Sequence, residues 1–408
     1  MTTETPFYTT TDPAAQLRAA IGDVFLIDDI TLADGAESGV IRFRGRFLAN
    51  PEHVYPQVRE RFRQLGYTPF FRKQGGQQVI IAAPGVVLVR PSRSWVNVVL
   101  FVLTVISVWW VGATMMRDTD TPPRNLLEFI LSGLPYAASL IGILLVHELG
   151  HYFMARRYGV AVTLPYFIPL PPFLLPNLMG TMGAAIMMKE PMPNRKIVFD
   201  IGVAGPIAGL FVAVPVLIYG LSLSTVGPLP RGGGFILEGN SLFYIALKYL
   251  MFGQVLPSVC LPGAGALDCL RRLMLSGALP ANAVDVSLHP IAFAGWAGLL
   301  VTMLNLLPAS QLDGGHVSYT LFGERSRYVS MGLSAFLLLL SLALFPVVGF
   351  DGLTWALWAG LIYFFGWRHP PTLNELVPLD APRRLLAVFV LILFVLLFVP
   401  VPLRTFAR

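Results

Sequence analysis

Two histidines and a glutamate lie close together in the stretch LLVHELGHYFMARRYG, residues 144–159. His147 and His151 are four residues apart, so a helix would project both imidazoles from one face, where they could bind one metal ion. Glu148 is adjacent to the first histidine and could take up or release a proton there. Together these residues form the HExxH pattern of zinc hydrolases, in which the glutamate acts as general base.

The same stretch ends an apolar run that reads as a membrane-spanning helix. A charged side chain at the centre of such a helix costs about 2.5–3.5 kcal/mol on insertion scales, so a cluster without a role would be costly to keep. The structural alternative is that both histidines hydrogen-bond to neighbouring helices while Glu148 reaches toward the membrane interface. A third ligand would favour the metal site over this alternative.

Catalytic zinc sites use three protein ligands and a water, so His147 and His151 leave one protein ligand to find. The run LNLLPASQLDGGH, residues 304–316, follows another apolar segment and supplies both Asp313 and His316. In the predicted topology both apolar segments end on the same side of the membrane, and therefore at the same depth. Spacing alone allows either residue as the third ligand.

Hydrophobic residues make up 55% of the 408-residue chain and charged residues only 13%. No soluble domain of this size can bury so much apolar surface, so the composition predicts an integral membrane protein. The formal net charge of +6 comes from basic residues that mostly flank apolar segments, so we expect contact with the lipid bilayer and no nucleic acid. The two cysteines, Cys260 and Cys269, exclude a cysteine-based zinc finger and could form one disulfide in an oxidising compartment.

The sequence predicts a polytopic α-helical membrane protein with about six to eight transmembrane helices and a small N-terminal soluble α+β domain. Within that domain, residues 1–92, the segments 39–48, 51–66, 67–73 and 77–83 read as strand, helix, strand and strand. A shorter apolar run at 241–253 could be re-entrant or interfacial. The predicted spans are about 96–116, 130–155, 197–219, 290–307, 328–349, 352–367 and 385–402.

Arginine and lysine are more frequent on one side of these spans, which orients residues 1–92 and the site toward the cytoplasm. The first residues, MTTETPFYTTTDPAAQ, have no apolar core and contain Glu4 and Asp12, so they do not read as a secretory signal or a transit peptide. We therefore expect a multi-pass protein of a bacterial inner (plasma) membrane.

Two motifs in this order resemble the paired signature of the site-2 protease family, the intramembrane zinc metalloproteases. The motifs are His147-Glu148-x-x-His151 and Asn305-x-x-Pro308-x-x-x-x-Asp313-Gly314. The segment between them, residues 180–210, is also similar to that family, particularly to its plant and cyanobacterial-type branch. The resemblance covers about 130–320, which implies a metalloprotease core there, within a transmembrane domain at 93–408.

The resemblance implies one zinc ion (Zn²⁺) per chain, with His147, His151 and Asp313 as its ligands. It makes Glu148 the catalytic general base and acid, and it sets Asn305 near the scissile carbonyl as a donor to the oxyanion. Zinc would supply a Lewis acid that acidifies water and polarises that carbonyl.

A site within the bilayer meets transmembrane helices, whose peptide groups are hydrogen-bonded, so a substrate segment must unwind before cleavage. Residues 180–188 resemble the family's re-entrant β-hairpin and could pair with the unwound segment by main-chain bonds, although an ordinary loop fits them equally well. We expect hydrolysis of peptide bonds in or near transmembrane segments of membrane-protein substrates, in regulated intramembrane proteolysis. Two alternatives stay open, namely a transporter that uses buried His, Glu and Asp, and a catalytically silent membrane scaffold.

Several further residues have structural explanations. Gly205 and Gly209 form a GxxxG pattern that predicts close helix packing beside the site. Asp200 could orient a metal-bound histidine, or it could simply carry charge at a helix start. By the resemblance His316 is a neighbour of the site and not a ligand. No stretch fits the PDZ domain that some site-2 proteases carry, so the N-terminal domain is the candidate substrate sensor.

Overall fold

The computed structural model of the chain describes residues 12–32, 39–88, 91–115, 123–171, 179–229, 235–260, 263, 265–275 and 282–406. The chain forms two compact units. Unit 1 comprises Met1–Arg90, Glu190–Ile197 and Pro370–Asp380, and unit 2 comprises Pro91–Lys189, Val198–His369 and Ala381–Arg408.

The described residues of unit 1 form a four-stranded antiparallel sheet and two helices. Its elements are α1 (Pro13–Ile21), β1 (Phe25–Leu32), β2 (Ile41–Phe47), α2 (Pro51–Gln64), β3 (Tyr67–Gln74) and β4 (Gln77–Pro84). The strand order is β1-β2-β4-β3, and Phe43, Phe71 and Ile80 are fully buried in one hydrophobic core. The strand, helix, strand and strand predicted over 39–83 are confirmed, whereas α1 and β1 were not predicted.

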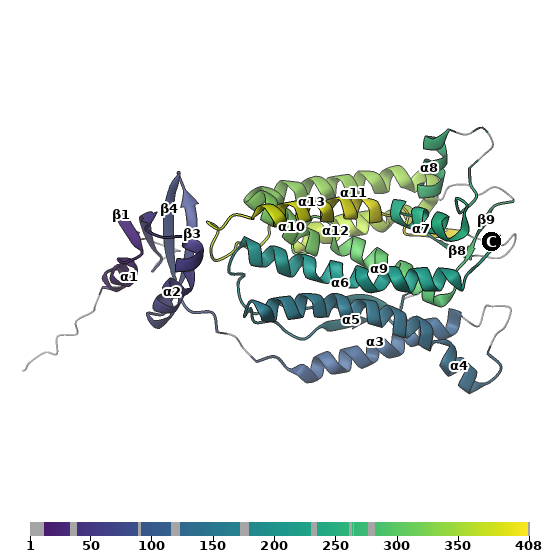
Figure 1. Cartoon of the computed structure of the whole chain (residues 1–408), viewed down its shortest axis with the longest axis horizontal. Helices are drawn as coiled ribbons and strands as arrows, with labels where there is room; N and C mark the ends of the chain where they lie inside the picture. The colour runs from purple at the N-terminus through teal and green to yellow at the C-terminus, as the bar shows by residue number, and fades with distance from the viewer. Residues whose placement is uncertain are drawn as a thin grey trace, which may run out of the picture. The chain divides into compact units, whose positions relative to one another are not determined.

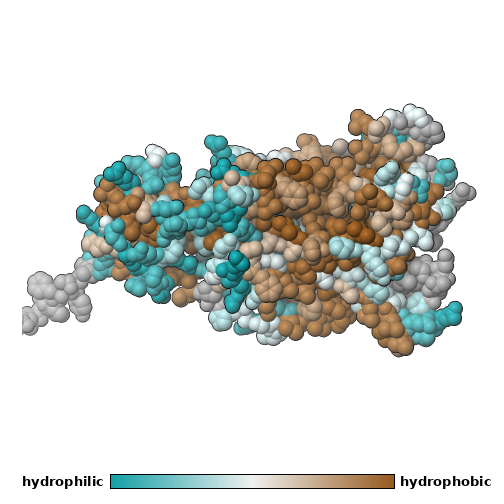
Figure 2. Space-filling model, viewed as in Figure 1, coloured by the Kyte–Doolittle hydropathy of each residue, from teal (hydrophilic) through white to brown (hydrophobic). Residues whose placement is uncertain are grey.

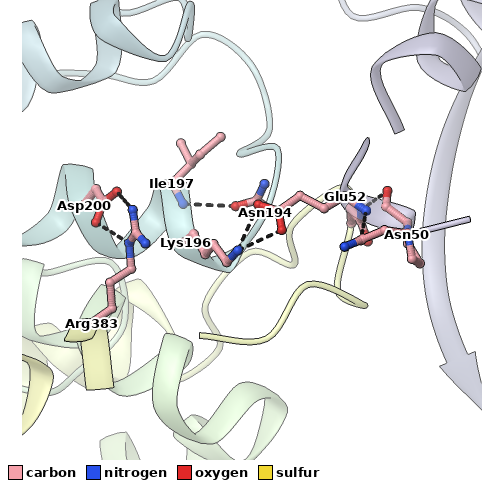
Figure 3. A network of polar contacts seen from close by, with 9 residues as sticks. Asn50, Glu52, Asn194, Lys196, Ile197, Asp200 and Arg383 are labelled. Atoms are coloured by element: carbon pink, nitrogen blue, oxygen red, sulfur yellow. Dashed lines mark hydrogen bonds and ion pairs between the residues drawn. The ribbon is translucent and has the colours of Figure 1, made fainter. Parts of the chain in front are cut away.

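Two short segments from distant parts of the chain complete unit 1. Leu373 is 1% exposed within the hydrophobic core, and its carbonyl accepts a hydrogen bond from the Phe71 N–H at 2.9 Å. Lys196 Nζ donates to both carboxylate oxygens of Glu52, at 3.0 and 2.7 Å (Figure 3). Ion pairing and apolar burial therefore both attach residues 190–197 and 370–380 to the N-terminal sheet. The predicted domain at 1–92 did not include these segments.

Unit 2 is mainly helical, and its longer helices lie side by side (Figure 1). The helices are α3 (Ser94–Met115), α4 (Leu126–Ser132), α5 (Leu134–Arg157), α6 (Arg195–Ser222, with its first residues in unit 1), α7 (Leu242–Phe252), α8 (Ala266–Leu275), α9 (Pro290–Asn305), α10 (Asp313–Phe322), α11 (Ser326–Val348), α12 (Thr354–Phe365) and α13 (Ala381–Leu397). Two 3₁₀ turns, η3 (Gly323–Arg325) and η4 (Gly349–Leu353), separate α10, α11 and α12.

Short antiparallel strand pairs connect these helices. The pairs are β5 (Tyr166–Pro169) with β6 (Thr181–Ala185), β7 (Thr225–Pro228) with β9 (Val284–Ser287), and β8 (Phe235–Glu238) with β10 (Leu403–Phe406). The strand expected within 180–188 is present as β6. The other two pairs join segments that are far apart in sequence, and neither was predicted.

Four helical stretches are long and apolar enough to cross a membrane, namely Ser94–Met115, Leu126–Arg157, Arg195–Ser222 and Asp313–Phe365. Their surfaces expose large hydrophobic side chains such as Ile106 of α3 and Leu339 of α11. Figure 2 shows hydrophobic residues covering much of the helical part of the chain. The prediction of a helical membrane protein with a small N-terminal α+β region is confirmed, and the described residues support four membrane-capable stretches.

Cys260 and Cys269 form a disulfide in unit 2, with their Cα atoms 4.8 Å apart. This distance lies within the usual range for disulfides. The sequence alone left this pairing open, because it depends on the redox state of the compartment.

Candidate metal centre

Helix α5 carries the HExxH residues in its C-terminal half. Pro135 in its first turn suits a helix start, and the helix ends at Arg157, before Gly159 adopts a left-handed φ of 68°. His147, Glu148 and His151 are only 3%, 4% and 6% exposed. The helix therefore presents three ionisable side chains to the interior of unit 2.

Asp313 is the first residue of α10 and reaches the histidines because the chain turns sharply after α9. A Cβ atom on Gly314 would lie 2.0 Å from the Leu306 carbonyl oxygen, and one on Gly315 would lie 2.3 Å from the Ser310 carbonyl oxygen. No other residue type fits so close a return of the backbone. The two glycines after Asp313 thus let this turn bring its carboxylate to α5.

The three candidate ligands meet in space. His147 Nε2 lies 3.2 Å from His151 Nε2. Asp313 Oδ2 lies 3.3 Å from His147 Nε2, and Asp313 Oδ1 lies 3.3 Å from His151 Nε2. Tetrahedral zinc with bonds of about 2.0–2.1 Å requires ligand atoms about 3.3–3.4 Å apart. The donor types and the spacing of the two nitrogens therefore suit zinc, while each histidine faces a different oxygen of Asp313. Among the described residues this is the one group of three or more His, Cys, Asp or Glu close enough to hold a metal ion.

A backbone carbonyl fixes the orientation of His151. Its Nδ1 lies 2.7 Å from the carbonyl oxygen of Ile201 on α6. Because a carbonyl can only accept, Nδ1 carries the proton, and the lone pair of Nε2 is left for a metal ion.

Asp200 is not the partner of this histidine. Its carboxylate accepts two hydrogen bonds from Arg383 of α13, both at 2.7 Å (Figure 3), and a third from the Tyr158 hydroxyl. This ion pair joins α6 to α13 and to the end of α5, directly beside Ile201. Of the two explanations offered for Asp200, neither anticipated the arginine.

The glycines of α6 lie directly against the two imidazoles. A Cβ atom on Gly205 would lie 2.0 Å from His151 Nε2, and one on Gly209 would lie 3.0 Å from His147 Nδ1. The close packing predicted from the GxxxG pattern is therefore present, and its contact surface is the pair of histidine rings.

Glu148 and Asn305 border the same group. Glu148 Oε1 lies 4.0 Å from His147 Nε2, and Ile186, just after β6, lines the same cavity as Glu148. Asn305, the last residue of α9, places its Nδ2 3.3 Å from His147 Nε2. One cavity of about 320 Å³ is lined by the three candidate ligands, by Glu148 and Asn305, and by Ala184 and Ala185 of β6 with Met187 after it.

His316 lines this cavity outside the ligand group. Its Nδ1 lies 2.6 Å from Nε2 of His369, whose ring stacks on Tyr319 with centroids 4.2 Å apart. Asp313, which spacing could not distinguish from His316, is the residue whose oxygens face both candidate ligand histidines. The contact with His369 was not predicted, since His369-Pro370 reads as a helix boundary.

The pattern of Peptidase family M50 matches residues 135–348, more than half of the chain. The chain belongs to peptidase family M50. This confirms the resemblance to site-2 proteases that the HExxH and LDGG motifs predicted. It also agrees with a zinc donor set and lends no support to the transporter or scaffold alternatives.

Plant proteins are among the similar sequences. The probable zinc metalloprotease EGY1, chloroplastic, of Arabidopsis thaliana is 34% identical over 286 residues, 69% of this chain and 46% of the relative. The rice (Oryza sativa subsp. japonica) protein of the same name is 29% identical over 401 residues, covering 88% and 62%. Probable zinc metalloprotease EGY2, chloroplastic, of Arabidopsis is 27% identical over 400 residues, covering 93% and 64%.

This M50 chain spans about half to just under two thirds of the length of these relatives. The plant-type branch expected from residues 180–210 is confirmed by them. The expected location in a bacterial inner membrane is wrong, because these relatives are named as chloroplastic proteins. No solved structure matches the chain.

Proposed function

We propose that the chain is an intramembrane zinc endopeptidase that hydrolyses peptide bonds in or near transmembrane segments of membrane proteins. The observation that carries this proposal is the convergence of the nitrogens of His147 and His151 and the two oxygens of Asp313, with Glu148 beside them. Regulated cleavage of membrane-bound proteins is the role that we expect. The chloroplastic relatives support a chloroplast membrane as its location.

In this proposal His147, His151 and Asp313 hold the ion. Bound zinc supplies a Lewis acid that acidifies water and polarises a carbonyl. Glu148 would take a proton from the attacking water and return it to the leaving amine. The Asn305 amide donates to the oxygen of the scissile carbonyl as negative charge develops on it.

The substrate would bind in an extended form along β6. Ala184 and Ala185 of β6 line the cavity that contains Glu148, and among the described strands β6 pairs with β5 alone. An unwound substrate segment could therefore add to β6 through main-chain hydrogen bonds, which do not depend on sequence. Residues that weaken helices, such as Gly and Pro, would mark cleavable segments.

We further propose that six to eight helices cross the membrane and that the catalytic core lies at about 130–320 in the domain 93–408. The stretch Asp313–Phe365 is far longer than the roughly 20 residues that one crossing needs. Ser334 of α11 donates to the Ala359 carbonyl of α12 at 3.1 Å, and Ser341 donates to the Gly352 carbonyl at 2.9 Å. These contacts support a helical hairpin in place of one long helix. The domain at 1–92, completed by 190–197 and 370–380, is the candidate substrate filter.

Metal analysis of the detergent-purified protein tests the site without knowledge of a natural substrate. We expect about one zinc per wild-type chain, and much less in His147→Ala and Asp313→Ala. Cleavage is then tested in liposomes with a single-span substrate that carries a Gly-Pro pair in its helix, and mass spectrometry locates the new termini. Glu148→Gln should keep its zinc and lose cleavage.

A folded wild-type protein without tightly bound metal would end the proposal. So would cleavage by Glu148→Gln at the wild-type rate. Zinc binding without cleavage of any transmembrane segment, when a soluble peptide is cleaved, would leave a zinc peptidase and remove the intramembrane substrate.

A further inference from the structure

A second cavity, of about 410 Å³, lies in unit 2 at the other end of α9 from Asn305. We call it the carboxylate cavity, because Glu238 of β8 and Asp285 of β9 both line it. Phe293, which also lines it, precedes Asn305 by twelve residues of helix, so the cavity lies about 18 Å along α9 from the metal centre. Its volume falls within the range of small-molecule sites, about 300–1,000 Å³.

A buried ionic cluster forms one wall of this cavity. Lys248 of α7 is 0% exposed, and its Nζ lies 3.3 Å from Asp285 Oδ1 and 3.8 Å from Glu238 Oε1. Tyr244 donates to Glu238 Oε1 at 3.0 Å, and its ring lies 4.7 Å below the lysine ammonium. These four residues come from α7, β8 and β9, which lie near one another in Figure 1.

The cluster has one cation for two carboxylates, so its ionised form carries an unbalanced negative charge. Among the residues that the structure describes, none is a hydrogen-bond partner for Oδ2 of Asp285, although this residue is only 2% exposed. Removing a carboxylate oxygen from water without a partner is costly, so such an atom calls for a cation or a donor. Burial also raises the pKa of Glu238 to about 7, which limits the full charge to neutral and higher pH.

The other walls are apolar and aromatic. Phe293 stacks on Trp296 with ring centroids 5.3 Å apart, and Phe235 stacks on Phe406 at 4.8 Å, so both lining rings are held in place. Leu229 and Pro290 add aliphatic surface. Rigid aromatic faces next to carboxylates are suited to a cation that carries an apolar body.

We propose that the carboxylate cavity binds an organic cation, a primary amine or guanidinium on an apolar body, with Asp285 and Glu238 as its counterions. The cation supplies the charge that Lys248 alone does not, and it offers hydrogen-bond donors to Asp285 Oδ2. The same chemistry is available from a free amine and from a lysine or arginine side chain of a polypeptide. This site is separate from the proposed peptidase centre and does not depend on that function.

Benzylamine is a suitable probe, with benzyl alcohol as the uncharged control of the same shape. Calorimetric titration of the full chain in detergent at pH 8 should show saturable binding of benzylamine and none of benzyl alcohol. Asp285→Asn keeps an oxygen for the Lys248 and Val286 contacts but removes the charge, and should weaken binding at least tenfold. The matched control is Asp268→Asn, a carboxylate of α8 that does not line the cavity and should change nothing.

Equal binding of benzyl alcohol, or undiminished binding by Asp285→Asn, would overturn the proposal. Should Asp285→Asn fail to fold, Ser287→Trp replaces it, because Ser287 is an exposed residue of the lining and a bulky side chain there should obstruct entry. Unchanged binding by that variant would equally count against the site. Competition with the peptide acetyl-Leu-Lys-Leu-amide identifies the source, since tighter binding of the peptide indicates a polypeptide side chain and tighter binding of benzylamine a free amine.

Discussion

A Cβ atom on Gly205 would lie 2.0 Å from Nε2 of His151, the atom that faces His147 and Asp313. Helix α6 thus passes the metal centre with no space for a side chain at this position. A residue larger than glycine at position 205 would have to displace the His151 ring or helix α6, so the site requires glycine there.

Gly205→Ala should therefore weaken zinc binding at least about tenfold, as disruption of groups that orient metal ligands commonly does. Gly142→Ala is the matched control, since it lies in α5 itself and a Cβ there meets nothing within 4 Å. Zinc competition with a chromophoric chelator measures both affinities. Equal affinities of the two variants would contradict this account of α6.

Asn305→Ala should reduce cleavage by about 10²–10³ and leave the zinc content unchanged, if its amide stabilises the oxyanion. The amide lies 3.3 Å from His147 Nε2, close enough to border the reacting carbonyl but outside the ligand group. The turnover of a single-span substrate in liposomes, compared with zinc content by elemental analysis, separates the two effects. Parallel loss of zinc would instead make Asn305 a support for the metal ligands.

Arg383→Gln should destabilise unit 2 by about 1.5–3 kcal/mol, since it removes two charge-assisted hydrogen bonds from the half-buried Asp200. Arg383→Lys keeps the charge but loses the bidentate geometry, so its loss of stability should be smaller than that of Arg383→Gln. Thermal unfolding in detergent gives the order of the three proteins. Equal stability of all three would show that the ion pair is not structural.

The stability of the chain should fall as the pH rises from 5 to 8, in part because of Glu238. Its pKa is raised in the folded state to about 7, from an ordinary value of 4.5, so folding favours the neutral carboxyl. That contribution is complete below about pH 4.5 and is lost as the pH rises through 7. Lys248 and Tyr244 of α7 and Asp285 of β9 face this group.

Glu238→Gln is neutral at every pH and lacks this contribution. The melting temperature of the wild type minus that of this variant should therefore decrease from pH 5 to pH 8. The other titrating groups are present in both proteins, so their effects cancel in this difference. A difference that stays constant over this range would rule out the raised pKa.

Part of the candidate metal centre was predictable from spacing, because His147 and His151 share a helix face through the period of the α-helix. Asp313 was preferred to His316 by the family resemblance, since spacing alone allowed either. The Ile201 carbonyl that orients His151 was not predictable, because every residue offers the same backbone oxygen. The His316–His369 contact depends on a return of the chain that no local pattern encodes.

In the fold, too, some elements could be predicted from local sequence and others could not. β2 was predicted from apolar residues that alternate with arginines over 39–48, but β1 contains Asp28 and Asp29, which interrupt the apolar pattern. The pairs β7–β9 and β8–β10 have four residues per strand and join distant segments, so their stability comes from tertiary packing and not from propensity.

The position of Leu373 in the core of unit 1 sets an order of events during synthesis. Its carbonyl accepts from Arg72 at 3.1 Å, 301 residues earlier in the chain. At about 5–20 residues per second, a ribosome needs roughly 15–60 s to cover that distance. The N-terminal sheet of unit 1 can therefore acquire this core residue only roughly 15–60 s after Arg72 has been made.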